Sequence, residues 1–213
     1  MRKVFLLSLL LVVLSLVIPW LVVTLSPAQE PAVQPIPSVT ASAAVAPDSE
    51  TAITALSGGE LVETTMADWL PGVVAAEMPA SFAPEALRAQ AVAARTYTLH
   101  KMAQGTIARH PDADACDDIT CCKAYETAED AAAGWGAGAL YYEEKLARAV
   151  SETDGEVLLY DGAPILAVFF SSADGSTQGA GDVWMSDLPY LQSVSSPENE
   201  ELVPNYYSTA SFT

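Results

Sequence analysis

The spacing of apolar and polar positions changes along the chain. Residues 66–77 and 84–102 have the apolar period of about 3.6 that is typical of helices, and Pro79 separates them because proline cannot continue a helix. Two further segments, residues 128–133 and 142–151, also have helical patterns. The pattern therefore predicts that residues 66–151 are mainly helical.

The period becomes two after the last predicted helix. Residues 156–160 and 165–170 are rich in Val, Leu, Ile and Phe, and Asp161-Gly162 lies between them. An Asp-Gly pair between two apolar runs is a strong hairpin signal. Helices followed by strands predict a single domain of the α+β class.

The N-terminus carries an uninterrupted apolar segment. The run from Val4 to Leu25 contains no charged residue, and it is long enough to cross the ~30 Å hydrocarbon core of a membrane. Arg2 and Lys3 precede it, which predicts a cytoplasmic N-terminus and a domain on the exported side of the cell membrane. A retained single-pass anchor over residues 1–25 is favoured, because no small-x-small cleavage site follows; a cleaved signal peptide is the alternative.

Two regions follow the apolar segment. Residues 26–59 contain several prolines among Ala, Val, Ser and Thr without any period, so they are predicted to be an extended Pro/Ala-rich linker. Residues 60–213 have the size of one ordinary domain.

Composition narrows the class of protein. The chain has 9 basic and 27 acidic residues and a formal net charge of -18, so its surface repels nucleic acid. With 51% apolar and only 17% charged residues, it can form a core and is not expected to be disordered throughout.

Arg95 and Glu77 are candidates for site chemistry. Arg95 falls within the apolar face of the helix predicted over 84–102, so it either pairs with a buried carboxylate or lines a cleft that binds an anionic or polyhydroxyl ligand. Glu77 ends the first predicted helix, where the helix dipole and apolar neighbours favour a protonated carboxyl that can act as a general acid. An ordinary exposed glutamate is the alternative for Glu77.

A loop between the second and third predicted helices contains possible metal ligands. His110, Cys116 and Cys122 follow one another at intervals of six residues, and one imidazole with two thiolates suits an open zinc site. A disulfide from Cys116 to Cys121 or Cys122 is the alternative on the exported side of a membrane.

Hydroxyl side chains gather after the predicted hairpin. Ser171, Ser172 and Thr177 surround Gly175 at the end of a predicted strand. Such a loop can bind sugar hydroxyls, although turn formation also explains these residue types.

Residues 72–82 and 85–97 resemble the signature of the stage II sporulation protein D family, whose domain also occurs in amidase enhancers. The resemblance continues through the His110–Cys122 loop into Lys123-Ala-Tyr125 and the segment 149–155. It then includes the predicted hairpin, Ser171-Ser172, Thr177, Trp184 and residues 189–194. It covers essentially residues 60–213. An N-terminal anchor with an exported domain is also the arrangement of that family.

The resemblance implies a peptidoglycan lytic transglycosylase. Such an enzyme cleaves the β-1,4 bond between N-acetylmuramic acid and N-acetylglucosamine without water and leaves a 1,6-anhydro product. By resemblance Glu77 is the catalytic acid and base, Arg95 holds substrate or positions Glu77, and His110, Cys116 and Cys122 bind zinc. Cys121 has no role in that pattern.

The resemblance also implies a cellular setting. Sporulating members act on glycan strands already stripped of stem peptides, together with a partner amidase/endopeptidase in a membrane complex during engulfment. The family domain continues beyond the equivalent of Thr213, so this chain is expected to be C-terminally truncated. Gln192 and Ser195 replace basic positions of the family, which weakens any substrate contact there. The rival interpretations are a non-catalytic wall-binding or amidase-enhancing module and a structural zinc module.

Overall fold

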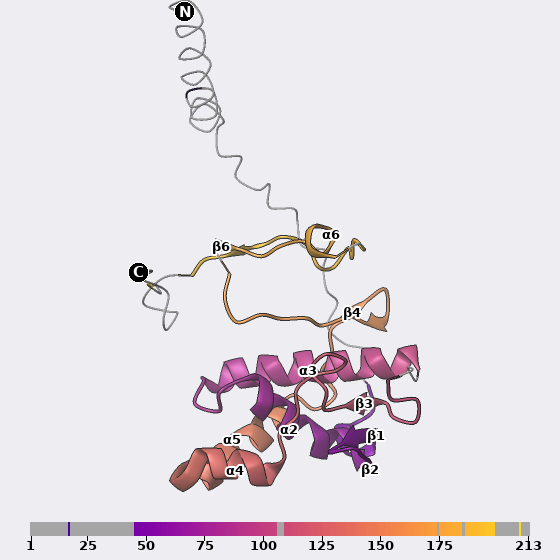
Figure 1. Ribbon diagram of the computed structural model, residues 1–213, viewed down its shortest axis with the longest axis vertical. Helices are drawn as coiled ribbons and strands as arrows, with labels where there is room; N and C mark the ends of the chain where they lie inside the picture. Colours follow the sequence, from indigo (N-terminus) through magenta and orange to yellow (C-terminus); the bar gives the residue numbers. More distant parts are fainter. Residues whose placement is uncertain are drawn as a thin grey trace, which may run out of the picture. The chain divides into compact units, whose positions relative to one another are not determined.

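The computed structural model describes residues 17, 45–105, 109–173, 175–184, 186–198 and 209 (Figure 1). The predicted anchor over residues 1–25 lies outside this part, apart from Val17, and so does the predicted linker up to residue 44. Every helix in the described ranges is too short or too polar to span a bilayer.

A small sheet opens the folded part and corrects the predicted order of elements. The short helix η1 (Asp48–Glu50) leads into strands β1 (Ala52–Ser57) and β2 (Glu60–Thr65), which pair antiparallel. Strand β3 (Ala115–Cys116) pairs parallel with β1, so the order is β2-β1-β3. Strands therefore precede the helices as well as follow them, and ordered structure begins before residue 60.

The predicted helices are all present. The first helix begins where the side chain of Thr65 accepts a hydrogen bond from the Asp68 N–H at 3.2 Å, and Pro79 follows its end. The second begins with Pro84, as expected for a proline at the first helical position. The four longer helices are α2 (Met66–Glu77), α3 (Pro84–Gln104), α4 (Ala128–Trp135) and α5 (Ala139–Glu152), with the short helix η2 (Gly136–Gly138) between the last two.

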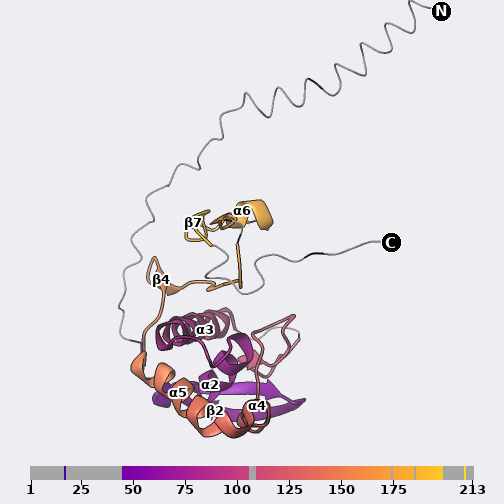
Figure 2. The same ribbon diagram turned by 90° about the vertical axis from the view of Figure 1, so that its left-hand side faces the viewer.

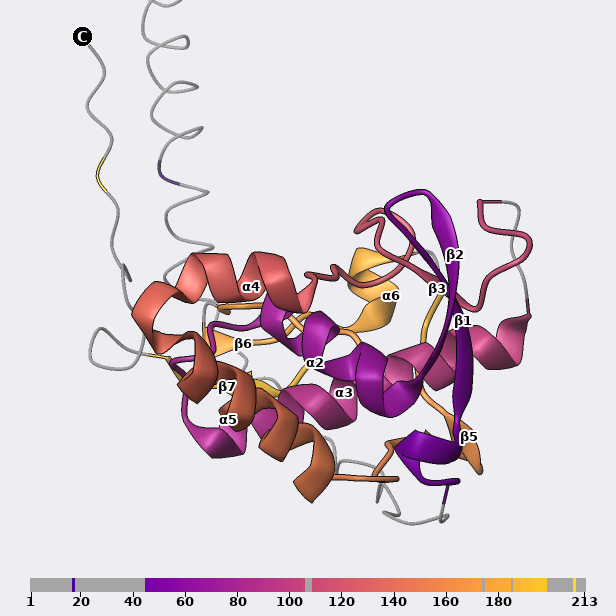
Figure 3. The same ribbon diagram turned by 90° about the horizontal axis from the view of Figure 1, so that it is seen from below.

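The core forms around α2. This helix contacts α3, α4 and α5, and the sheet, α2, α4 and α5 all lie on one side of α3 (Figure 2). Figure 3 shows α2 between α3 and α4. The fully buried side chains include Ile53, Leu70, Val74, Leu87 and Leu146. Each buried aliphatic side chain of this size stabilises the fold by about 1.5–3 kcal/mol.

One loop packs closely against α2. The ring of Tyr125 stacks on Trp69 with centroids 4.0 Å apart and planes 5° apart, and the Glu126 N–H donates to the carbonyl of Gly72 at 3.1 Å. A Cβ on Gly72 would overlap the Tyr125 ring and lie 2.6 Å from the Glu126 carbonyl oxygen. Only glycine at position 72 allows the backbone of residues 125–126 to approach the helix this closely.

The predicted hairpin forms with a shorter ladder than expected. Strands β4 (Leu159–Tyr160) and β5 (Ala163–Pro164) pair antiparallel across Asp161-Gly162, which have φ of 50° and 78°. The Ile165 N–H still donates to the Leu158 carbonyl at 3.1 Å, but the Leu158 N–H donates to the Thr96 hydroxyl at 3.0 Å and not to residue 165. Residues 165–170 then run on without regular pairing.

The last elements are short. Strand β6 (Gly175–Ser176) pairs with β7 (Ser195–Ser196), and α6 (Ala180–Val183) lies between them in sequence. The described part is therefore of the predicted α+β class.

Candidate functional site

Glu77 is the last residue of α2, and its half-buried carboxylate is held by the loop that packs on this helix. The backbone N–H of Ala124 donates to Glu77 Oε1 at 3.0 Å. The side chain is therefore oriented by a fixed donor, unlike an ordinary exposed glutamate.

Lys123 lies beside Glu77 and is held by two aromatic rings. Its Nζ is 4.6 Å from the ring centroid of Tyr97 on α3 and 3.9 Å from that of Phe169, which are cation–π distances. Burial lowers the pKa of Lys123, and the negative charge of Glu77 opposes this by raising it. The structure thus places a half-buried ammonium within electrostatic reach of the carboxylate.

Tyr97 connects this group to the cysteine loop. Its hydroxyl donates to the carbonyl of Cys121 at 3.4 Å, and burial, followed by nearby thiols and Glu77, raises the pKa of Tyr97 to about 12. The phenol is therefore neutral and remains a hydrogen-bond donor at ordinary pH. Sequence reasoning gave no role to Tyr97, Lys123 or Phe169, although the first two belong to the blocks that carry the resemblance.

Arg95 is the buried partner of a carboxylate, one of the two alternatives that its position left open. The side chain is 1% exposed, and its Nε and Nη2 donate to the two carboxylate oxygens of Asp48 at 2.7 and 2.6 Å. Further bonds go to the carbonyls of Val150 and Glu156 at 3.2 and 3.1 Å. These bonds tie α3 to η1 and to the end of α5, so Arg95 acts here as a structural residue.

The predicted metal ligands come together, and a fourth residue joins them. One ligand atom from each of His110, Cys116, Cys121 and Cys122 lies within 4.8 Å of every other. All three cysteines of the chain are free, so neither of the disulfides considered above is present. Cys121 was given no role by sequence reasoning.

The imidazole of His110 presents one nitrogen to this cluster. Its Nδ1 lies 2.8 Å from the carbonyl oxygen of Ala113, which can only accept, so Nδ1 carries the proton. Nε2 is then unprotonated in the neutral ring and lies 3.4 Å from Cys122 Sγ. A free imidazole nitrogen supported by a carbonyl, next to thiols, is the donor set that zinc prefers. The residues therefore fit a zinc ion.

The loop that carries the cluster is attached to β1. The N–H of Asp114 donates to the Thr54 carbonyl at 2.7 Å, and the Asp114 carboxylate accepts from the Thr54 N–H at 2.9 Å. Asp117 makes the same kind of pair, with the carbonyl of Leu56 at 3.2 Å and the N–H of Gly58 at 2.8 Å. The sheet thus fixes both sides of Cys116.

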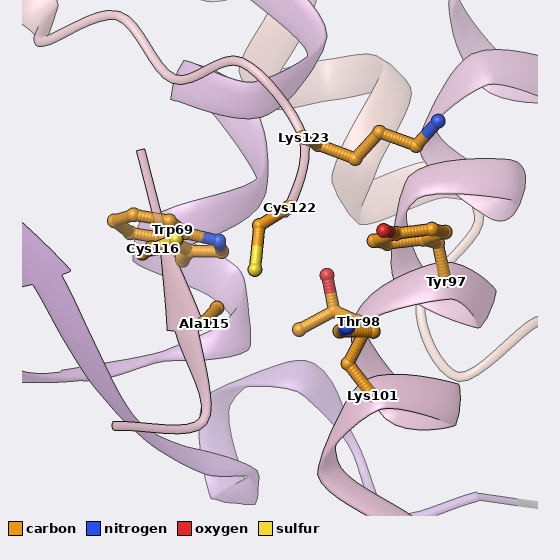
Figure 4. Close-up of a pocket in the computed structure, with 8 residues that line it drawn as sticks. All are labelled: Trp69, Tyr97, Thr98, Lys101, Ala115, Cys116, Cys122 and Lys123. Carbon is orange, nitrogen blue, oxygen red and sulfur yellow. The ribbon is translucent and has the colours of Figure 1, made fainter. Parts of the chain in front are cut away.

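A small pocket lies next to the cluster. In Figure 4 the thiol of Cys122 points into it, and the hydroxyl of Thr98 on α3 faces that thiol. Burial raises the pKa of Cys116, and it raises the pKa of Cys122 to about 12. The lining residues are Trp69, Tyr97, Thr98, Lys101, Ala115, Cys116, Cys122 and Lys123.

The hydroxyls predicted to bind sugar make local contacts. Ser172 Oγ donates to Glu198 Oε2 at 2.5 Å, and Thr177 Oγ1 accepts from the Val194 N–H at 2.9 Å. Ser171 is exposed. The bonds of Ser172 and Thr177 go to the segment around β7 and not to α2 or α3.

Comparison with known proteins identifies the class to which this site belongs. Residues 58–160 match the profile of the family described as Stage II sporulation protein, SpoIID. These residues include Glu77, Arg95, the His110–Cys122 loop and Lys123. This part of the chain therefore matches the SpoIID family domain.

Individual relatives agree with that assignment. The chain is 40% identical over 149 residues to the stage II sporulation protein D of Bacillus subtilis, and 38% identical over 146 residues to that of Bacillus amyloliquefaciens. Both matches cover 68% of this chain and 42% of the relative. An amidase enhancer of Bacillus subtilis is 38% identical over 122 residues, which is 57% of this chain and 14% of that protein. The chain thus spans less than half the length of these relatives.

Proposed function

We propose that this protein is a peptidoglycan lytic transglycosylase that cleaves the β-1,4 bond between N-acetylmuramic acid and N-acetylglucosamine. One observation carries the proposal: Glu77 is a half-buried carboxylate at a helix end, held by the Ala124 N–H and adjacent to the ammonium of Lys123. A single oriented carboxylate is sufficient when the nucleophile belongs to the substrate itself.

The reaction uses Glu77 twice. The protonated carboxyl gives its proton to the glycosidic oxygen as the bond from that oxygen to C1 of the muramyl sugar breaks. The resulting carboxylate takes the proton of the C6 hydroxyl of the same sugar while O6 forms a bond to C1. The acid is regenerated, no water is consumed, and the product ends in a 1,6-anhydro sugar.

Neighbouring residues orient the reacting groups. The Ala124 N–H fixes one carboxylate oxygen, which leaves the other free for the proton transfers. The Lys123 ammonium is held over two rings and offers charge-assisted hydrogen bonds to sugar oxygens near Glu77. His110, Cys116 and Cys122 would hold zinc, which supplies rigidity to the loop that presents Lys123 and Ala124.

The setting proposed for this activity is the wall of a sporulating cell. The relatives named sporulation protein D support a role in sporulation, and the relative named amidase enhancer supports a partnership with an amidase. An endopeptidase partner and a membrane complex are proposed from the resemblance alone. The acidic chain favours glycan from which acidic stem peptides have been removed.

Product analysis tests the proposal. The chain is incubated with denuded glycan strands in heavy-oxygen water, and the products are analysed by mass spectrometry. We expect ends that are one water lighter than hydrolysis products and that carry no label. Labelled ends would show a hydrolase and overturn the proposal.

The rival function is a non-catalytic module that binds wall glycan and stimulates an amidase, which the amidase enhancer match favours. In that case glycan binding and amidase stimulation would be measurable without any anhydro product, and Glu77→Gln would leave both unchanged.

A further inference from the structure

We infer that the outer side of α5, together with the turn between α2 and α3, binds a glycan strand beside Glu77. On this surface Tyr141 stacks on a sugar ring and Arg148 pairs with the free lactyl carboxylate of a muramyl residue. The inference rests on the proposed function for the nature of the ligand, and it adds a binding surface outside the group of residues around Glu77. A muramyl lactyl group carries this carboxylate only when no stem peptide is attached to it, because the peptide is joined there by an amide bond.

Positive charge is scarce in this protein and gathers on this surface. Beyond the N-terminal apolar run the chain has seven basic residues against 27 acidic ones, and Arg88, Lys145 and Arg148 are three of the seven. The Nε of Arg148 and the Nη1 of Arg88 donate to the two carboxylate oxygens of Glu152, at 2.7 and 2.8 Å. These bonds tie the start of α3 to the end of α5. The gathered cations offset the negative charge of the chain for an anionic ligand that approaches here.

Arg148 keeps hydrogen-bond donors for a ligand. Its side chain is 76% exposed, and among the described residues only Glu152 accepts from it, through Nε. The two Nη groups therefore have no acceptor in this part of the chain, and a guanidinium can bind a carboxylate through two parallel hydrogen bonds. Exposed ion pairs contribute little to stability, so α5 does not depend on Arg148 for its folding.

Tyr141 supplies an aromatic ring on the same side of α5. It precedes Arg148 by seven residues, so the two side chains lie on one face of the helix, about 10.5 Å apart along its axis. The ring is 65% exposed and contacts Tyr142 edge-on, with centroids 5.2 Å apart. Two helical turns are close to the length of two linked sugars. One strand can therefore place a sugar on the ring and a muramyl carboxylate at the guanidinium.

Lys145 joins this face of α5 to the turn that follows Glu77. Its Nζ donates to the carbonyls of Ala80 and Phe82, at 2.9 and 2.5 Å. Phe82 is 46% exposed and lies only five residues after Glu77, whereas Lys145 lies one helical turn after Tyr141. The surface is therefore continuous from the end of α2 to α5. A strand whose scissile bond lies at Glu77 can extend over this turn onto the helix.

Equilibrium binding tests the inference without any cleavage. All chains carry Glu77→Gln so that the strands stay intact, and two probes are compared: denuded strands with free lactyl carboxylates, and the same strands with these groups converted to methylamides. We expect the parent chain to bind the free carboxylates at least about tenfold more tightly, as for the loss of one hydrogen bond to a charged group. Adding Arg148→Gln should remove this preference, and adding Tyr141→Ser should weaken the binding of both probes alike.

Lys101→Gln is the matched control, because it removes the same charge at the other end of α3, and it should keep the preference. The unfolding temperatures of Arg148→Gln and Tyr141→Ser should equal that of the parent, since both side chains are exposed. Equal binding of the two probes by the parent, or an equal loss of preference in Lys101→Gln, would overturn the inference.

A protein partner on this surface would give a different result. Unchanged strand binding in Arg148→Gln and Tyr141→Ser, together with lost binding to a purified wall amidase, would assign the surface to that partner and overturn the inference. Binding is measured here in a chain that does not cleave, so failure of this inference and failure of the proposed transglycosylase activity are distinguishable.

Discussion

The Ala124 N–H donates to Glu77 Oε1 at 3.0 Å, across a sequence separation of 47 residues. This bond connects the end of α2 to the loop that follows the cysteine cluster. It means that the position of the carboxylate depends on the position of that loop, and the predictions for Gly72 and for metal removal follow from this dependence.

The ammonium of Lys123 is predicted to contribute directly to turnover. Lys123→Met keeps the apolar stem but removes a charged donor beside Glu77, and hydrogen bonds to charged groups are worth about 1.5–3 kcal/mol. We expect kcat on denuded glycan to fall about 10- to 100-fold with little change in Tm. Lys101→Met, on α3 and also lining the pocket, is the control and should retain activity. Equal losses in both variants would exclude a specific role for Lys123.

The close approach at Gly72 is predicted to matter for both stability and activity. In Gly72→Ala the new methyl group meets the Tyr125 ring and the Glu126 carbonyl, so residues 124–126 must move away from α2. Overpacking of this kind costs about 1–3 kcal/mol. Chemical denaturation and glycan turnover should both show a loss.

Gly134→Ala is the matched control for Gly72→Ala. Gly134 lies in α4 and has no heavy atom within 4 Å of an added Cβ, so alanine should stabilise the helix by about 0.5–1 kcal/mol. An equally mild effect at Gly72 would contradict the packing described here.

The pair Arg95–Asp48 is predicted to be a unit of stability. Removing either partner leaves an uncompensated buried charge and costs about 3–5 kcal/mol of unfolding free energy. In the cycle formed by Arg95→Met and Asp48→Ala, the double variant should be much more stable than the sum of the single losses implies. Additive losses would indicate that the two residues do not act together.

Metal removal is predicted to loosen the segment that orients Glu77. Chelation should speed amide hydrogen exchange over residues 121–125 and leave the exchange of α5 unchanged, because only the former segment contains cluster residues. In the Cys122→Ala variant, which lacks one of the proposed ligands, the amides of residues 121–125 should exchange rapidly with or without chelator. If chelation left the exchange rates of the wild type unchanged, the metal would have no part in ordering the segment that orients Glu77.

The helices could be predicted from the sequence because their limits are set by local chemistry. Pro79 and Pro84 bound α2 and α3, and Thr65 caps α2. The hairpin of β1 and β2 was missed because its Ala, Thr and Ser content resembles a linker. Gly58-Gly59 between two short runs was the available signal, and φ of 60° and 85° explains why glycine stands at both positions.

Parts of the candidate site could not be predicted because they depend on contacts between residues that are far apart in the sequence. The apolar face of α3 indicated that Arg95 needs a partner, but Asp48 precedes it by 47 residues. Cys121 was left out because its neighbour Cys122 completed the six-residue spacing, and the turn at Asp118 that brings both thiols together has no simple sequence signature. Glu77 was found from its place at a helix end. Its donor is the backbone N–H of Ala124, which cannot be predicted from the residue type because almost every residue has such a group.

The most direct test of the proposed activity is Glu77→Gln assayed on denuded glycan strands, with Glu143→Gln at an exposed position of α5 as control. General acid–base catalysis contributes about 10²–10⁴-fold, so release of 1,6-anhydro-muramyl ends should fall by at least about 100-fold in Glu77→Gln and stay at the wild-type level in the control. Wild-type rates of anhydro product formation by Glu77→Gln would contradict the assignment.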